Sequence, residues 1–223
     1  MIAVIAAMDS EVSAIVSKMN AEAKKIQGIE FYEGTLENKD VVVMKSGVGK
    51  GNAAMSTTIL LEHYPVEQIV NIGTAGGLKE NENILDAVLS ERVVQHDFDT
   101  SPIDGEAGIG LYYDADPKLL AICEAALRGL AVTVHKGLVA SGDQFIAGEA
   151  TKNLCDKFPD AMCAEMEAGA IAQVSAHYQV PFVILRSLSD VACKPDSHMD
   201  FQEYVKHASE RSAMFTQELM RRL

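Results

Sequence analysis

Tryptophan is absent from the 223 residues and cysteine is scarce. Without tryptophan, any stacking of a planar ligand must use Phe or Tyr. The four cysteines are widely spaced and form no CxxC pair, a pattern typical neither of a zinc site nor of a disulfide framework. We therefore expect reduced, buried thiols, no metal, and a cytoplasmic location.

Basic residues are also few, with 19 Lys and Arg against 32 Asp and Glu, so the formal net charge is −13. A surface of this charge repels phosphate backbones and anionic lipid headgroups, and it favours solubility. We expect no nucleic-acid or membrane partner. A strongly anionic substrate would need a local cluster of Lys or Arg, and the sequence contains none.

Long hydrophobic runs are missing, and none approaches the ~18 apolar residues of a membrane span. The apolar start "MIAVIAAM" is short, has no basic region before it, and is followed by Asp9 and Glu11. We expect a first buried strand here and no signal peptide.

Two common nucleotide-binding motifs are absent. "GVGKG" lacks the earlier glycine and the following Ser or Thr of a P-loop, and "GTAGG" is not GxGxxG, which also excludes a dehydrogenase. These glycines predict tight strand-to-helix turns, or backbone N–H groups that face a ligand at a helix N-terminus. The turns alone do not choose between the two.

Buried, β-branched strands alternate with helices along the whole chain. This alternation predicts an α/β protein with one domain over residues 1–223, built on a mixed, largely parallel central sheet flanked by helices. We expect strands at 1–7, 30–36, 40–46, 66–78, 84–99, 131–143 and 181–190, and a short strand that passes into a helix over 161–178. We expect further helices at 9–19, 47–64, 116–130, 149–157 and 201–223, and a loop at 100–110.

Ligands in such sheets bind at the carboxyl ends of strands, where this sequence places many polar residues. In "AEMEAGAIA", strand alternation would put Glu165 and Glu167 on one face and Met166 on the other. Paired carboxylates have their pKa values pushed apart, which favours a functional site. The alternative is that one glutamate caps the next helix and the other is paired structurally.

Three further residues have open alternatives. Asp190 ends a strong strand, where it could reach a ligand, cap a helix or pair with Arg186. Glu11 follows the first strand, and its spacing alone favours a solvated glutamate in a first helical turn. Phe145 follows "SGDQ" and could stack on a planar ring or belong to the core.

Taken together and in this order, "AAMDSEV", "KSGVGKGNAA", "NIGTAGGL", "SGDQFI", "AEMEAGAIA" and "RSLSDVA" resemble the 5′-methylthioadenosine/S-adenosylhomocysteine nucleosidases. These belong to the purine nucleoside phosphorylase-like superfamily, and the resemblance spans nearly the whole chain. It implies cleavage of 5′-substituted adenine nucleosides to adenine and the 5-substituted ribose, in methionine salvage and S-adenosylmethionine recycling, with no cofactor.

The resemblance also implies three catalytic residues. Glu11 would activate the attacking water, Glu167 would bind the ribose hydroxyls, and Asp190 would protonate the leaving adenine. Glu165 would be a supporting carboxylate. The remaining implied positions bind the base, the sugar or the 5′ group, or orient the acids: Met8, Val48, Thr74, Ala75, Gly76, Phe145, Ile146, Met166, Arg186, Ser189 and Phe201.

Two alternatives to a hydrolase remain. A phosphorylase must bind a phosphate dianion, usually with arginines, but the "GDPxR" pattern is absent and Glu11 would repel phosphate. A non-catalytic nucleoside-binding protein would not need Glu11, Glu167 and Asp190 together. Both arguments favour hydrolysis by water.

One stretch departs from the family pattern. Family members carry an "AFGYxxGQ"-like segment after the "HD" strand, where this chain has "HDFDTSPIDGEAGIG". The loop from Thr100 to Gly110 lies near the 5′ side in the family, so the 5′ substituent stays open. The resemblance further implies a homodimer.

Overall fold

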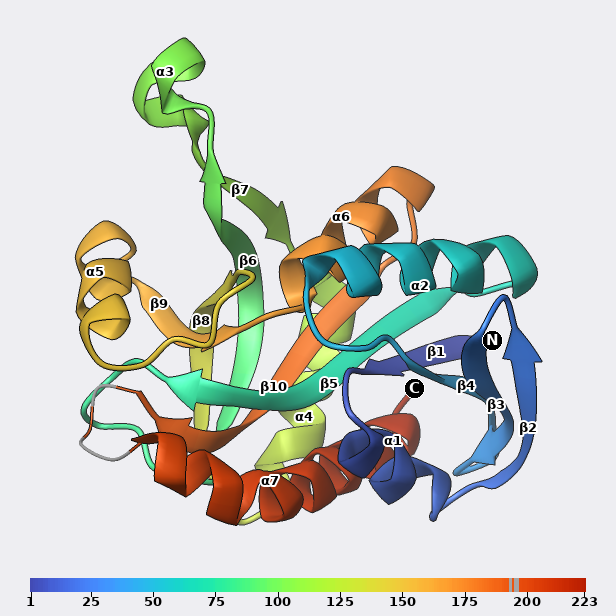
Figure 1. Ribbon diagram of the computed structural model, residues 1–223. Coiled ribbons are helices and arrows are strands. Elements are labelled where there is room, and N and C mark those ends of the chain that lie inside the picture. The colour runs from blue at the N-terminus through green and yellow to red at the C-terminus, as the bar shows by residue number, and fades with distance from the viewer. Residues whose placement is uncertain (193, 195–196) are drawn as a thin grey trace.

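The computed structural model describes residues 1–192, 194 and 197–223, and the side chains of 197–203 lie outside the described part. Ten strands of the described chain form one mixed sheet (Figure 1). The strands are β1 (Ile2–Ala6), β2 (Asn20–Ile26), β3 (Ile29–Leu36), β4 (Lys39–Lys45), β5 (Gln68–Gly77), β6 (Ala87–Asp99), β7 (Ile109–Asp114), β8 (Val134–Ser141), β9 (Ala161–Glu165) and β10 (Phe182–Val191).

The sheet contains two parallel blocks. Strands β4, β1, β5 and β10 run parallel to one another, as do β6, β8 and β9. The two blocks meet antiparallel at β10–β6 and at β5–β9. Because β10 pairs with both β5 and β6, five strands close into a ring, and β4, β3 and β2 extend the sheet to an open edge at β2.

Helices cover both faces of the sheet (Figure 1). One apolar core lies between the strands and α1, α4 and α7, and a second lies between the strands and α2 and α6. A smaller core lies under α5. The bounds are α1 (Asp9–Val16), α2 (Lys50–His63), α4 (Pro117–Arg128), α5 (Glu149–Lys157), α6 (Ala168–Tyr178) and α7 (Ser197–Met220).

Two of the strands predicted from the sequence are buried along their whole length. Every residue of β1 and of β10 is buried, as expected for strands covered on both faces. Residue Asp116 caps α4 by accepting hydrogen bonds from the N–H groups of Lys118 and Leu119, 2.9 Å each. The predicted α/β class with a mixed, mostly parallel sheet is confirmed.

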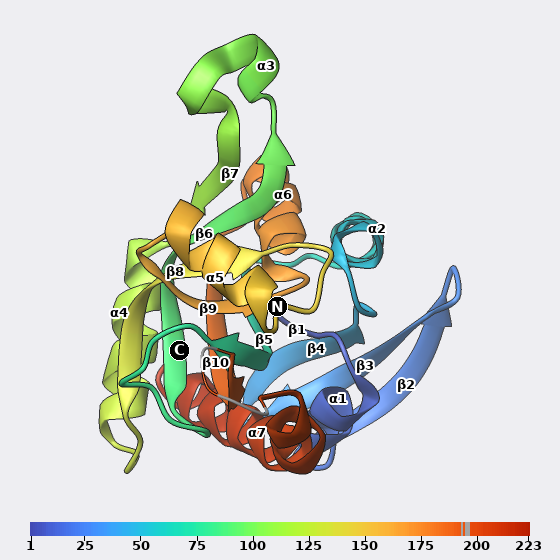
Figure 2. The ribbon, with the colours of Figure 1, turned by 60° about the vertical axis from the view of Figure 1, so that its left-hand side comes forward.

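Strands β6 and β7 form an arm that projects from the rest of the molecule (Figure 2). At its tip lie α3 (Ser101–Asp104) and a 3₁₀ turn (Gly105–Gly108). The prediction of a plain loop at 100–110 was therefore wrong, because this segment folds locally and runs directly into β7. The edge strand β2 was also missed, and α1 ends earlier than predicted.

Within the described chain, no helix combines the length and the apolar character needed to cross a membrane.

Candidate active site

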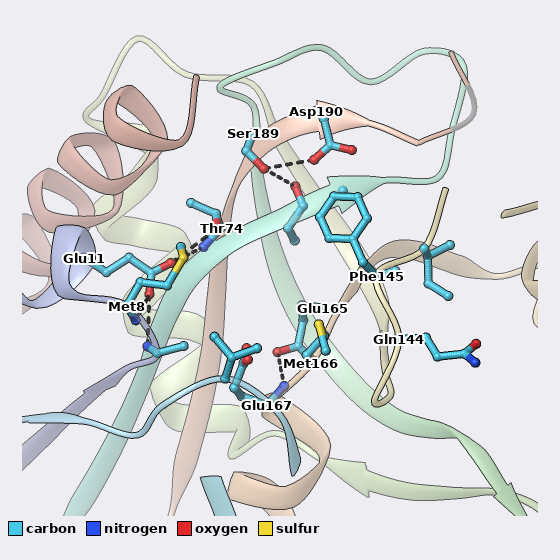
Figure 3. A pocket seen from close by; sticks show the side chains of 16 residues that line it. Met8, Glu11, Thr74, Gln144, Phe145, Glu165, Met166, Glu167, Ser189 and Asp190 are labelled. Carbon is cyan, nitrogen blue, oxygen red and sulfur yellow. Dashed lines mark hydrogen bonds between the residues drawn. The ribbon is translucent and has the colours of Figure 1, made fainter. Parts of the chain in front are cut away.

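A cavity lies where the carboxyl ends of β1, β5 and β10 meet the ends of β8 and β9 (Figure 3). In Figure 3, Asp190 and Phe145 lie toward one side of it, and Glu11 and Met8 toward the other. The lining residues are Ala7, Met8, Glu11, Val48, Thr74, Ala75, Gly76, Gln144, Phe145, Ile146, Ala164, Glu165, Met166, Glu167, Ser189 and Asp190.

Glu11 is buried, with 1% of its surface exposed, and its carboxylate is held by the turn between β1 and α1 and by β5. Its Oε2 accepts hydrogen bonds from the N–H groups of Ala7 and Met8, 3.0 Å each. Its Oε1 accepts one from the Thr74 N–H at 2.9 Å. Burial raises the pKa of Glu11, although these N–H groups and the nearby Arg186 charge act in the opposite direction. Glu11 is thus a fixed carboxyl, not a solvated helix-start residue.

Asp190 owes its orientation to an irregularity in β10. The register against β5 shifts between Leu188 and Asp190, so Ser189 is an extra residue in the manner of a β-bulge. Ser189 Oγ donates to Asp190 Oδ1 at 3.0 Å. Gly76 faces Asp190, and a Cβ at this glycine would lie 3.0 Å from Asp190 Oδ2. The bulge and the glycine together make room for a buried acid at the cavity wall.

The loop after β8 supplies the apolar side of the cavity. Phe145 is half exposed and Ile146 is buried. Figure 3 shows the Phe145 ring and Asp190 toward the same side of the cavity that both line. An aromatic face and a buried acid in one cavity suit a planar, nitrogen-containing ring.

Glu165 and Arg186 form a buried ion pair behind the cavity. Arg186 Nη2 donates to Glu165 Oε2 at 2.6 Å and to Asn71 Oδ1 at 2.7 Å, and the Arg186 side chain is 1% exposed. Glu165 Oε2 also accepts from the N–H groups of Glu167 and Ala168, at 3.0 and 2.8 Å, and so caps α6. Glu165 therefore fills both structural roles that the sequence left open for the pair of glutamates.

Two expectations about this pair need correction. The strand β9 ends at Glu165, and Glu167 is the N-cap residue of α6, so the two do not alternate along one strand. Arg186 does not line the cavity, because its hydrogen bonds turn it toward Glu165 and Asn71. The Arg186 charge still acts on Glu11, because it partly offsets the rise in the Glu11 pKa that burial causes.

Glu167 faces the cavity from the opposite side to Asp190. Its Oε1 accepts a hydrogen bond from the Gly49 N–H at 3.1 Å, and 8% of its surface is exposed. Burial, followed by the negative charge of Glu165, raises the pKa of Glu167 to about 8. A carboxyl of this kind accepts or donates hydrogen bonds near neutral pH.

Most predicted site residues come together in this one cavity, with Met8, Val48 and Met166 lining its wall. The Phe201 side chain lies outside the described residues. The sequence did not single out Ala7, Gln144 or Ala164, which also line the cavity. Each is next to a residue that was singled out, so adjacency to a strand-end motif was the available signal.

The arrangement places one buried acid and an aromatic ring at one side and two buried carboxyls at the other. Such a site can protonate a planar leaving group at Asp190 while carboxylates stabilise positive charge and activate a nucleophile. It therefore suits acid-assisted cleavage between a ring base and a hydroxylated group.

Comparison with known proteins agrees with this chemistry. The family model described as the phosphorylase superfamily matches residues 1–221. A 5′-methylthioadenosine/S-adenosylhomocysteine nucleosidase of Bacillus thuringiensis (strain Al Hakam) is 40% identical over 229 residues, covering 100% of this chain and 99% of the relative. The chain belongs to this nucleosidase family.

Solved structures extend the likeness to three dimensions. The nucleosidase of Neisseria meningitidis in complex with methylthio-immucillin-A has a TM-score of 0.94 and 32% identity, covering 100% of this chain and 99% of that one. A futalosine hydrolase of Helicobacter pylori has a TM-score of 0.92 and 28% identity, covering 100% and 97%. The nucleosidase fold thus covers the whole chain, and the futalosine hydrolase has the same fold.

Proposed function

We propose that this chain hydrolyses the N-glycosidic bond of 5′-methylthioadenosine and S-adenosylhomocysteine, releasing adenine and the 5-substituted ribose for methionine salvage and S-adenosylmethionine recycling. The observation that carries the proposal is the placement of Asp190 and Phe145 at one side of the cavity and of Glu11 and Glu167 at the other. Residues 1–223 act as one nucleosidase domain.

The reaction needs one bond broken and one formed. The adenine ring stacks on Phe145, and Asp190 gives its proton to the imidazole-ring nitrogen as the bond from C1′ to the base breaks. Glu167 accepts hydrogen bonds from the ribose hydroxyls, and in its ionised form it favours the cationic sugar electrostatically. Glu11 takes a proton from water as the water oxygen bonds to C1′. Proton exchange with solvent then returns Asp190 and Glu11 to their starting states.

Water is favoured over phosphate as the nucleophile. Within the described chain, the residues that line the cavity include four acids, Glu11, Glu165, Glu167 and Asp190, and no Lys or Arg. The buried Arg186 is already engaged by Glu165. A phosphate dianion would meet carboxylates without a bidentate cationic partner, so phosphorolysis is disfavoured.

The test is adenine release from methylthioadenosine in phosphate-free buffer, measured beside an Asp190→Asn variant. We expect release by the wild type and a loss of roughly 10²- to 10⁴-fold in kcat for the variant, the usual contribution of a positioned acid. Release that requires added phosphate would indicate a phosphorylase. Nucleoside binding without any release would indicate a non-catalytic binding protein.

The 5′ substituent is the part of the substrate that the arm would affect. The arm segment 100–110 differs from the family pattern, and a futalosine hydrolase shares the fold. The same assay with S-adenosylhomocysteine and futalosine ranks the three substrates by kcat/KM. We expect methylthioadenosine and S-adenosylhomocysteine to exceed futalosine, and the reverse order would reassign the substrate.

We also propose a cytoplasmic homodimer. Large apolar side chains are exposed on α2 and on the arm, with Met55 53%, Phe98 38% and Ile103 86% exposed. Exposed apolar side chains that gather into one contiguous patch mark an interaction surface. A cytoplasmic setting agrees with the free state of Cys123, Cys155 and Cys163.

A further inference from the structure

A ring of charged and hydrogen-bonded groups lies outside the cavity and joins three segments. Lys50, the first residue of α2, contacts Asp97 through Nζ, and Asp97 Oδ2 accepts the Asp143 N–H at 3.0 Å. Asp143 Oδ1 accepts the Lys50 N–H at 2.7 Å, which closes the ring. We call Lys50, Asp97 and Asp143 the Lys50 network. None of the three is among the described residues that line the cavity.

On one side, the Lys50 network adjoins the backbone group that holds Glu167. The Gly49 N–H donates to Glu167 Oε1 at 3.1 Å. Gly47 and Gly49 have φ values of +78° and +93°, in the region that only glycine adopts readily. Asn52 Nδ2 holds this peptide from one side by donating to the Val48 carbonyl at 2.7 Å, and the anchoring of residue 50 is a second constraint on the direction of the Gly49 N–H.

A second connection runs from Lys50 to the helix that starts after Glu167. Lys50 Nζ lies 3.3 Å from Gln95 Oε1. Gln95 Nε2 donates to the Gly169 carbonyl at 3.1 Å and to Gln173 Oε1 at 2.8 Å. Both acceptors belong to α6, the helix that starts after Glu167. Lys50 is therefore linked to Gly49, which donates to Glu167, and to the helix that follows Glu167.

The third segment of the network carries the aromatic side of the cavity. Asp143 directly precedes Gln144, Phe145 and Ile146, which line it. The hydrogen bonds of Asp143 to Lys50 and Asp97 therefore fix the start of the loop that presents Phe145.

We propose that the Lys50 network is a positioning device for the nucleosidase reaction, holding the Gly49 amide against Glu167 and the 144–146 loop over the base. This inference rests on the proposed function for its effect on turnover. Lys50, Asp97 and Asp143 touch no reacting atom, so they are positioning residues. The lysine of "GVGKG" thereby has a role other than binding phosphate.

The expected cost falls on rate more than on stability. The Lys50 and Asp97 side chains are 17% and 32% exposed, and partly solvated ion pairs of this kind add little to stability. Replacing Lys50 by Met keeps the apolar stem but leaves Asp97 beside Asp143 without its cation. A displacement of about 1 Å in a positioning group can cost roughly 100-fold in rate.

The kinetic experiment compares Lys50→Met, Lys50→Arg, Asp97→Asn and the double variant Lys50→Met/Asp97→Asn with the wild type. We expect Lys50→Met to lower kcat/KM for methylthioadenosine by roughly 10- to 100-fold. We expect Lys50→Arg to retain part of the activity, and the losses of the two single variants not to add in the double variant, because both remove one interaction.

The pH profile separates positioning from a general structural loss. The Gly49 hydrogen bond lowers the pKa of Glu167, whereas the neighbouring Glu165, Arg186 and Glu11 are unchanged in these variants. Loss of that bond moves the limb of the profile that belongs to Glu167 to higher pH. Lys157→Met is the matched control, since Lys157 on α5 pairs at 3.4 Å with Asp99, which lies on β6 like Asp97, and among the described residues neither Lys157 nor Asp99 bonds to Gly49.

A readout that needs no turnover tests the network directly. Amide exchange of Gly49, followed by NMR, should accelerate at least about tenfold in Lys50→Met and not in Lys157→Met. Wild-type kinetics and exchange in Lys50→Met would overturn the inference and leave the proposed function standing. Faster exchange in Lys50→Met, together with no adenine release by the wild type, would support the network while the proposed function fails.

Discussion

Glu167 combines burial with a like-charged neighbour, and this sets its protonation. Its pKa rises to about 8 from the usual 4.5, mainly through burial and then through Glu165. Between pH 4.5 and about pH 8, Glu167 keeps its proton in the folded chain and has released it in the unfolded chain. The contribution of Glu167 to folding stability therefore falls as the pH rises from about 5 to 8.

Glu167→Gln should flatten this pH dependence, because glutamine does not titrate. Urea unfolding at pH 5 and pH 8 measures it: the wild type should lose more stability than the variant over this interval. The slope is reduced and not abolished, because Glu11 keeps a raised pKa. Parallel curves for both proteins would contradict the raised pKa. The exposed Glu149→Gln on α5 is the control and should match the wild type.

Single residues were predictable where sequence position alone determines their surroundings. Asp190 was predicted at the carboxyl end of a strand, where it could reach a ligand. Spacing alone favoured a solvated Glu11, and only the family resemblance implied that both acids share one site. The partners of Arg186 could not be predicted, because β9 and β10 come together only through the order of strands in the sheet. For the same reason, the residues alone could not show that Glu165 pairs with Arg186 while Glu167 faces the cavity.

At the scale of elements, the Arg186–Glu165 pair joins β10 to β9 and to the start of α6. Removing one partner from a buried pair leaves an uncompensated charge, at a cost of about 3–5 kcal/mol. We expect Arg186→Met to lower the free energy of unfolding by this amount in urea titration, and Arg186→Met/Glu165→Gln to recover part of it.

A surface pair provides the contrast. Arg128 pairs with Glu124 along α4 and its side chain is 75% exposed, so Arg128→Met should change stability by about 0.5 kcal/mol or less. If Arg186→Met behaved like Arg128→Met, the ion pair would not be what ties these elements together.

Elements were predictable where burial imposes a pattern. The strands β1 and β10 are buried throughout, and β1 reads "IAVIA" while β10 begins with the apolar run "FVIL". In contrast, β2 is mostly exposed and reads "NAEAKKI". An edge strand with little burial has neither an apolar run nor a strict alternation, so β2 was missed. The short α3 and the 3₁₀ turn lie in a segment without buried periodicity, apart from Gly108.

At the scale of the whole molecule, the exposed apolar residues on the arm should control assembly. We expect sedimentation to give twice the 24.1 kDa of one chain for the wild type. Ile103→Glu places a charge at the arm tip and should shift the population toward monomer at low micromolar concentration. Met214→Glu is the control, because Met214 is 37% exposed on α7, away from the arm (Figure 1). A monomeric wild type would contradict the proposed dimer.

The open edge at β2 has a consequence for the behaviour of the protein at high concentration. Ring closure through β10 leaves no free backbone edge there, but β2 presents unpaired N–H and C=O groups to solvent. Lys24 and Lys25 stand on this strand, and an incoming strand would have to bury their charges. The weak strand character that made β2 hard to predict thus also protects the molecule against edge-to-edge aggregation.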